Sequence, residues 1–150
     1  DVGRIPAKTP QADIKCKLAC VDALQKIVQG VVALDDAGEI LEKYRSKLNS
    51  SGTPGTGDAF LRHLSNYRGD PNRVKKIALT KDEDGNFVDF PVTADLKKFH
   101  QDDRIFVALA CAAADDPIIF NAVDSDYKEH AEALTAVGVA VHEICPHCLK

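Results

Sequence analysis

Short apolar runs rich in β-branched residues alternate along this chain with longer segments that have helical periodicity. The runs "VVALD", "VKKIALT", "PIIFNAV" and "VAVHEIC" are predicted strands. The segments of helical periodicity are at about 12–29, 36–49, 58–68, 102–116 and 125–138. Strands that are apolar on both faces and separated by helices indicate a largely parallel sheet with right-handed crossovers. The sequence therefore predicts an α/β fold.

Two helices carry more specific expectations. In the segment 12–29, apolar residues recur at steps of three and four, which predicts one buried face made of Ile14, Leu18, Val21, Leu24 and Ile27. The segment 102–116 is apolar nearly all round and rich in alanine, so it is expected to lie at the centre of the fold. A short helix is also predicted at 95–100, after an extended segment at 87–91.

Composition bounds the class of protein. A chain of 150 residues, 45% hydrophobic and 28% charged, is expected to form one soluble domain over 1–150. No apolar run approaches the roughly 20 residues of a membrane span. The net charge of -4 argues against binding nucleic acid by bulk attraction. The odd count of five cysteines, without a secretory signal, favours reduced thiols and a cytoplasmic location.

Three acidic pairs are expected to meet at one edge of the sheet, because the carboxyl ends of parallel strands lie together. They are Asp35 and Asp36, Asp102 and Asp103, and Asp124 and Asp126. Carboxylates held close repel one another unless a cation neutralises them. The pattern therefore predicts a site for Mg²⁺ or Mn²⁺ that suits hydrolysis of a phosphodiester.

Helix capping is the competing interpretation, because aspartate is a favoured N-cap and each pair precedes a helix. Asp35 or Asp36 would cap the helix at 36–49, with Glu39 at capping-box distance from Asp36. The two interpretations can divide the pair at 124–126, with Asp126 as the cap and Asp124 as the better metal ligand.

The stretch "HQDDRIFVALACAAADDPIIFNAVDSDYKEHAEALTAVGVAVHEICP" resembles the C-terminal half of a PIN-like domain, and "VVALDDAGEILEKYRSKLNSSGTPGTGDAF" resembles the front half of one bacterial branch of that family. The resemblance implies a three-layer α/β/α sandwich with a mainly parallel central sheet. It also implies a metal-dependent ribonuclease, such as the toxin of a toxin-antitoxin pair. RNA, an antitoxin protein and a second copy of the chain are the partners implied.

The family's acidic positions can be carried over residue by residue. Asp103 matches the acid that opens the long helix, Asp124 the acid after the fourth strand, and Asp126 a frequent additional one. The family's helical glutamate falls on Lys43, so Glu42 or Glu39 substitutes for it, or Lys43 has replaced a ligand. In the last case the chain is a catalytically impaired module that binds RNA or a protein partner.

The resemblance also implies a central first strand that ends in an acid. "DVGRIP" resembles the segment that follows this strand, and Asp1 does not occupy the place of the acid. The expectation is therefore that the N-terminal strand is missing from the sequence and would lie before residue 1. A Toprim-type metal site is a weaker alternative, because it needs a glutamate at the end of an earlier strand.

The cysteines and basic residues allow further interpretations. Cys145 and Cys148 of "CPHC", with Cys16, Cys20 and His147, could bind zinc; otherwise "CPHC" is a redox motif, or Cys16, Cys20 and Cys111 are small buried residues. The basic residues could grip RNA phosphates or form a solvated face. They are Arg62, His63, Arg68, Arg73, Lys75, Lys76, Lys97, Lys98, His100 and Arg104, with Tyr67 and Tyr127 as candidate stacking platforms.

Overall fold

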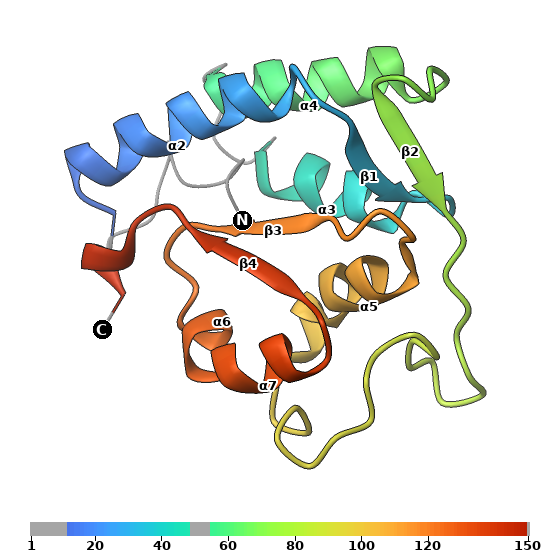
Figure 1. Cartoon of the computed structure of the whole chain (residues 1–150). Coiled ribbons are helices and arrows are strands. Elements are labelled where there is room, and N and C mark those ends of the chain that lie inside the picture. The colour runs from blue at the N-terminus through green and yellow to red at the C-terminus, as the bar shows by residue number, and fades with distance from the viewer. Residues whose placement is uncertain (1–11, 49–54, 150) are drawn as a thin grey trace.

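The computed structural model describes residues 12–48 and 55–149 as a mixed α/β protein, which confirms the α/β prediction but not the three-layer sandwich (Figure 1). The helices and strands are α2 (Ile14–Ile27), β1 (Val32–Asp35), α3 (Glu39–Leu48), α4 (Thr56–Tyr67), β2 (Val74–Ile77), α5 (Arg104–Ala112), β3 (Ile118–Asn121), α6 (Ser125–Glu129), α7 (Ala131–Ala136) and β4 (Ala140–Glu143). Two 3₁₀ helices, η2 (Gln101–Asp103) and η3 (Pro146–Cys148), complete them. None of the helices in these ranges has both the length and the apolarity needed to cross a membrane.

The strands form two parallel pairs. β1 pairs with β2, Val32 opposite Val74, and β3 pairs with β4, Ile118 opposite Ala140. Within the described residues each pair is a separate two-stranded sheet. Figure 1 shows β1 running toward the start of α3 on the right, whereas β3 runs toward α6 on the left. The parallel pairing is as predicted, but the two pairs do not continue into one sheet.

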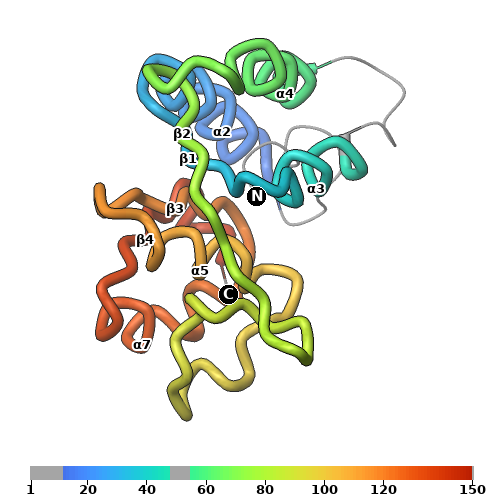
Figure 2. The backbone as a smooth tube through the Cα atoms, turned by 90° about the vertical axis from the view of Figure 1, so that its right-hand side faces the viewer, coloured from blue at the N-terminus to red at the C-terminus, as the bar shows by residue number. Residues whose placement is uncertain are grey.

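Helix α5 lies between two apolar cores. Its residues Ile105 and Leu109 belong to a cluster formed mainly by α2, α3, α4, β1 and β2. Its residues Val107 and Ala108 belong to a second cluster with Phe99 and residues from α6, α7 and the start of β4. Figure 2 shows the first group of helices at one end of the molecule and β3, β4 and α7 toward the other. The expectation that this helix is central is confirmed.

Of the face predicted for helix α2, Leu24 is buried and Ile27 packs against the core, but the first half of the helix turns another face inward. Cys16, Cys20 and Leu24 face the core, whereas the side chains of Ile14 and Leu18 are 76% and 65% exposed. The spacing of four residues makes Cys16, Cys20 and Leu24 a continuous stripe as well. Their partner across the core is at the far end of the chain, so local periodicity could not select this stripe.

The segment 81–100 contains no helix. An isolated bridge joins Lys81 to Phe87, and turns follow. The predicted short helix at 95–100 is therefore wrong; Leu96 and Phe99 instead anchor a turn by inserting into the second core. The predicted helix at 125–138 is interrupted at His130, which separates α6 from α7.

Candidate functional site

Asp103 occupies the N-cap position of α5, but its partly buried carboxylate does not act as a cap. It ends η2 directly before α5, and its side chain makes no capping hydrogen bond. Only 16% of the side chain is exposed, and Nδ1 of His100 lies 3.7 Å from its Oδ2. Burial is the largest cause that raises the pKa of Asp103, and the negative charge of Asp124 raises it further. A proton or a cation would relieve both effects.

Asp124, the second of these carboxylates, follows β3 and directly precedes α6. Its Oδ1 accepts a hydrogen bond from the backbone N–H of Asp126 at 3.0 Å, so Asp124 is the N-cap of α6. Asn121, which is fully buried, fixes the turn by accepting from the N–H of Asp124 at 3.1 Å and donating to its carbonyl at 2.8 Å. The prediction that Asp126 caps this helix is therefore wrong, because the cap lies two residues earlier, at Asp124.

Asp126 faces the segment that leads into η2. Its Oδ2 accepts a hydrogen bond from the backbone N–H of His100, which ties α6 to the residues just before Asp103. Burial raises the pKa of Tyr127 strongly, and the charges of Asp103, Asp124 and Asp126 all add to this rise. The three predicted metal ligands are thus all near enough for their charges to act on one tyrosine.

Helix α3 presents lysines to this acidic segment. Lys43 Nζ lies 3.9 Å from Oδ1 of Asp102, and the charge of Lys47 lowers the pKa of Asp103 against the larger effect of burial. The carboxylate of Glu42 is instead exposed and forms an ion pair with Arg45 at 2.8 Å. Among its described contacts, nothing brings Glu42 to the other predicted ligands.

Asp35 and Asp36 lie elsewhere, so the prediction that all three acidic pairs share one edge is wrong. Asp35 is 4% exposed, and its two oxygens accept hydrogen bonds from the N–H groups of Glu39 at 2.8 Å and Ile40 at 2.9 Å. Asp35 is therefore the cap of α3. Asp36 lines a small pocket with Arg68 and not the space beside Asp103. Because β1 and β3 run toward opposite sides, their carboxyl ends cannot meet (Figure 1).

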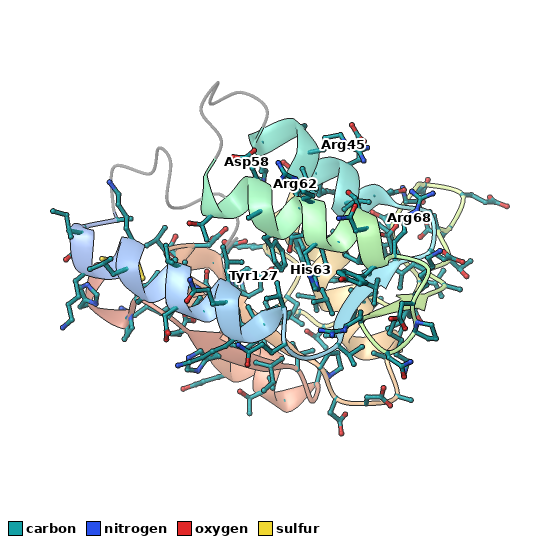
Figure 3. The ribbon with its side chains drawn as sticks, turned by 90° about the horizontal axis from the view of Figure 1, so that it is seen from above. Arg45, Asp58, Arg62, His63, Arg68 and Tyr127 are labelled. Atoms are coloured by element: carbon teal, nitrogen blue, oxygen red, sulfur yellow. A yellow bond between two sulfur atoms is a disulfide. The ribbon has the colours of Figure 1, made fainter. Side chains whose placement is uncertain are left out.

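The basic residues divide into two groups. Figure 3 shows Arg62 of α4 and Arg68, which follows this helix, on the same side as Arg45. The second group borders the acidic residues: beside His100, the guanidinium of Arg104 donates to the carbonyls of Lys97 at 2.8 Å and Phe99 at 3.1 Å. This second group lies next to Asp103, where it could contact a phosphate held there.

The two candidate stacking residues differ in exposure. Tyr67 is 42% exposed, but Arg73 covers its ring at 5.6 Å. Tyr127 is only 3% exposed and packs edge-on against Phe99, so it cannot be a surface platform. Tyr127 therefore lies in the interior beside the acidic residues and is not a surface on which a base could stack.

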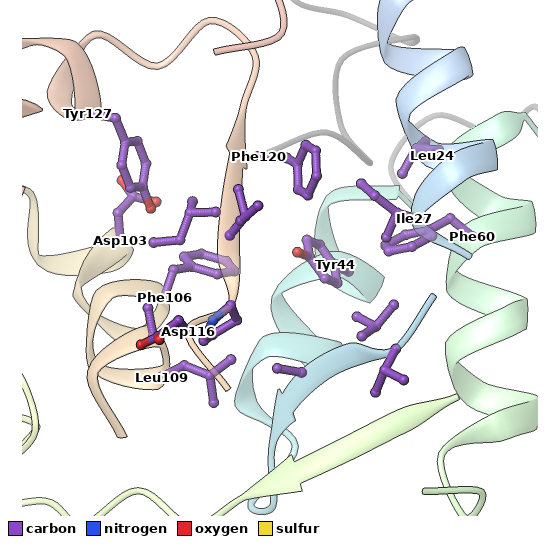
Figure 4. A pocket seen from close by; sticks show the side chains of 17 residues that line it. Leu24, Ile27, Tyr44, Phe60, Asp103, Phe106, Leu109, Asp116, Phe120 and Tyr127 are labelled. Carbon is purple, nitrogen blue, oxygen red and sulfur yellow. The ribbon is translucent and has the colours of Figure 1, made fainter. Parts of the chain in front are cut away.

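A cavity of about 400 Å³ begins beside Asp103 and extends between the two sheets. Figure 4 shows Asp103 and Tyr127 on one side of it and Phe60 on the other, with Tyr44 between them. Burial raises the pKa of Tyr44 to about 12, so its hydroxyl keeps its proton at neutral pH. Sequence reasoning missed this cavity, because its lining comes from segments between Leu24 and Tyr127 that carry no shared local pattern.

Cysteines from both ends of the chain meet below α2. Cys16 and Cys145 form a disulfide, and Sγ of Cys20 lies 3.9 Å from Sγ of Cys145. The expectation that all thiols are reduced is therefore wrong for this pair. Cys111 is exposed and not buried as expected. In the described ranges, the sets of three side chains close enough to share a metal ion occur here, and not among the carboxylates.

Comparisons with protein-family models, with curated proteins and with solved structures gave no match. The interpretation of the site therefore depends on the chemistry of its own residues.

Proposed function

We propose that this chain is a PIN-like ribonuclease that depends on Mg²⁺ or Mn²⁺. Asp103, Asp124 and Asp126 would bind the metal, with Glu42 as a further catalytic candidate from α3. The proposal depends above all on Asp103. Its carboxylate is partly buried, makes no capping hydrogen bond, and is repelled by the negative charge of Asp124. A divalent cation stabilises such a pair of carboxylates, and it can both activate water and offset charge on a phosphate.

The surroundings of Asp103 support RNA as the substrate. The cavity beside it has aromatic walls and, at about 400 Å³, is within the size range of small-ligand sites, which suits a nucleobase. His100 and Lys43 lie next to the acidic segment, where their cationic forms would contact the phosphates on either side of the scissile bond. A base in the cavity would therefore place its phosphate near the metal.

The three carboxylates must approach one another to share an ion. Mg²⁺ keeps several of its waters and often takes only one or two protein carboxylates, so Asp103 and Asp124 suffice for a first contact. Asp126 and Glu42 would then act through bound water.

The proposal includes one three-layer α/β/α sandwich with a mainly parallel sheet. In such a sandwich the β1–β2 pair and the β3–β4 pair, each parallel within itself, would belong to one sheet with its strands in the same direction.

Cleavage of single-stranded RNA with and without Mn²⁺ tests the function. Asp103→Asn and Asp124→Asn should each abolish Mn²⁺-stimulated cleavage while circular dichroism shows a folded chain. Asp36→Asn is the matched control, because it removes an exposed acid outside the site, and it should cleave like the parent. Equal cleavage by Asp103→Asn and the parent would refute the assignment.

The lysines of α3 favour a second candidate, a catalytically impaired module that binds RNA or a protein. Lys43 and Lys47 already bring positive charge to Asp102 and Asp103, as a metal would. Calorimetric titration with Mn²⁺ separates the candidates: the enzyme binds Mn²⁺ and loses this binding in Asp103→Asn, whereas the module binds RNA without Mn²⁺.

The protein partners follow only from the family resemblance. A small antitoxin protein that covers the acidic site and a homodimer are the two proposed. Light scattering on the purified chain measures whether it is a dimer, and inhibition of RNA cleavage by a co-expressed partner tests the antitoxin.

A further inference from the structure

Three buried sulfur atoms converge where α2 meets the C-terminal residues. Cys16 and Cys20 lie one turn apart on α2, and Cys145 follows β4; all three residues are 0% exposed. Their Sγ atoms all lie within 4.8 Å of one another. The disulfide accounts for Cys16 and Cys145, but it leaves Cys20 as a buried thiol beside it without a disulfide partner.

Cys148 is a fourth thiol one 3₁₀ turn after Cys145. The backbone N–H of Cys148 donates to the carbonyl of Cys145 at 2.9 Å, which bends the chain back toward α2. Cys148 is half-buried against the same apolar core as Cys20. Cys20 and Cys148 therefore border the same core, where α2 meets the C-terminal residues.

The side chains around Cys148 extend the same group. Nε2 of His147 lies 3.2 Å from Oδ1 of Asp13, the N-cap of α2. Asp13, His147 and Cys148 also have ligand atoms within 4.8 Å of one another. The cap of α2 and the turn of η3 are therefore held together beside the sulfur atoms, as an outer layer that would fix the turn.

The distance between the sulfurs of Cys20 and Cys145 matches the spacing of two sulfur ligands on a tetrahedral ion. Zinc–sulfur bonds of about 2.3 Å at tetrahedral angles put neighbouring sulfurs about 3.8 Å apart. The distance between the sulfurs of Cys20 and Cys145 is 3.9 Å. Packing alone explains a single buried cysteine, but it does not explain why two cysteines of α2 meet Cys145 from the other end of the chain, with Cys148 one 3₁₀ turn further on.

We propose that Cys16, Cys20, Cys145 and Cys148 bind one structural zinc ion when the protein is reduced, and that the Cys16–Cys145 disulfide is the metal-free oxidised form of the same site. A small dithiol reductant supplies two electrons and two protons to this disulfide and becomes a cyclic disulfide. Zn²⁺ then displaces the protons of the four thiols, which leave to solvent. Four protein ligands close the site, so the ion connects α2 to η3 and has no open position for catalysis.

Zinc content of the full chain tests this proposal directly. The chain is expressed with zinc, purified with a dithiol and passed over a weak chelating resin before elemental analysis. The parent and Cys111→Ser, which removes an exposed cysteine outside the site, should each hold about one zinc per chain. Cys20→Ser and Cys148→Ser should hold less than a tenth of that. A zinc-free reduced parent, or full zinc content in Cys20→Ser, would overturn the proposal.

A measurement on the parent alone covers the case in which a variant does not fold. Titration with Co²⁺ should give the strong visible bands of a tetrahedral site together with thiolate charge transfer, saturating at one ion per chain. With zinc bound, an aromatic disulfide reagent should react rapidly with Cys111 only, and with all five cysteines after a strong chelator is added. Rapid reaction of four or more thiols in the zinc-loaded chain would contradict the site. Neither readout depends on RNA cleavage or on Asp103.

Discussion

Replacing Asp35 by alanine should lower the free energy of unfolding by about 3 kcal/mol. The sequence predicted a metal ligand at this strand end, but in the structure Asp35 caps α3. Its two oxygens accept hydrogen bonds from the N–H groups of Glu39 and Ile40, and the residue is 4% exposed. Loss of an N-cap costs about 0.5–2 kcal/mol. An unpaired buried N–H adds about 1–3 kcal/mol, and Ile40 is almost fully buried, so water cannot replace the carboxylate.

Urea unfolding followed by circular dichroism measures the effect. A loss of about 3 kcal/mol corresponds to a fall in Tm of roughly 6–12 °C for a chain of this size. Asp36→Ala is the matched control, because Asp36 is exposed and makes no capping bond, and it should stay within about 0.5 kcal/mol of the parent. Asp35→Asn keeps one acceptor oxygen and should fall between the two.

The same variants separate a structural acid from a catalytic one. If Asp35 acts only as a cap, the folded fraction of Asp35→Ala should cleave RNA with Mn²⁺ as well as the parent does. Equal stability of Asp35→Ala and Asp36→Ala would refute the capping argument. Loss of Mn²⁺ binding in a folded Asp35→Ala would instead return Asp35 to the metal site.

Three further predictions concern stability. Asp103→Asn should raise the metal-free free energy of unfolding at neutral pH, because burial and Asp124 raise the pKa of Asp103 and so penalise its charged form; denaturant titrations should show the gain vanishing as pH falls through that pKa. Cys16→Ser should cost about 5 kcal/mol under oxidising conditions by the chain-entropy model, since the disulfide spans 129 residues, while Cys111→Ser should change little in the same urea titration. Gly138→Ala should cost about 1 kcal/mol, because Gly138 has a φ of 81°, whereas thermal melts of Gly69→Ala, in open space, should match the parent.

Local patterns predicted most of the segments that form helices and strands, but not the turns at 95–100 or the break at His130. The β-branched runs became β1 to β4, and both strand pairs are parallel because helices connect their members. How the two pairs are placed relative to each other has no local signal. It depends on how α5 packs between two cores, which involves residues far apart in the chain.

The error on α2 shows why periodicity has limits. Apolar residues occupy two stripes of this helix, one with Ile14 and Leu18 and one with Cys16 and Cys20. Both stripes satisfy the spacing of three and four. The choice is made by Cys145, which lies 129 residues beyond Cys16 and bonds to it.

The acidic site was predicted in part. Asp103 and Asp124 were expected to meet, and the charge of Asp124 does act on Asp103. Asp35 was expected beside them and is instead the cap of α3, because the direction of β1 relative to β3 is a tertiary property. The exchange of roles between Asp124 and Asp126 is a smaller error, since α6 starts at Ser125, directly after Asp124, and Asp126 lies inside its first turn.

The bond between Cys16 and Cys145 makes most of the described chain a covalent ring with short tails. A protease that cuts once inside this ring, for example at the exposed turn 82–85, opens the ring but releases no fragment. The two pieces stay attached and keep a high effective concentration for reassociation. Limited proteolysis should therefore leave one band on a gel without reductant and two bands after reduction.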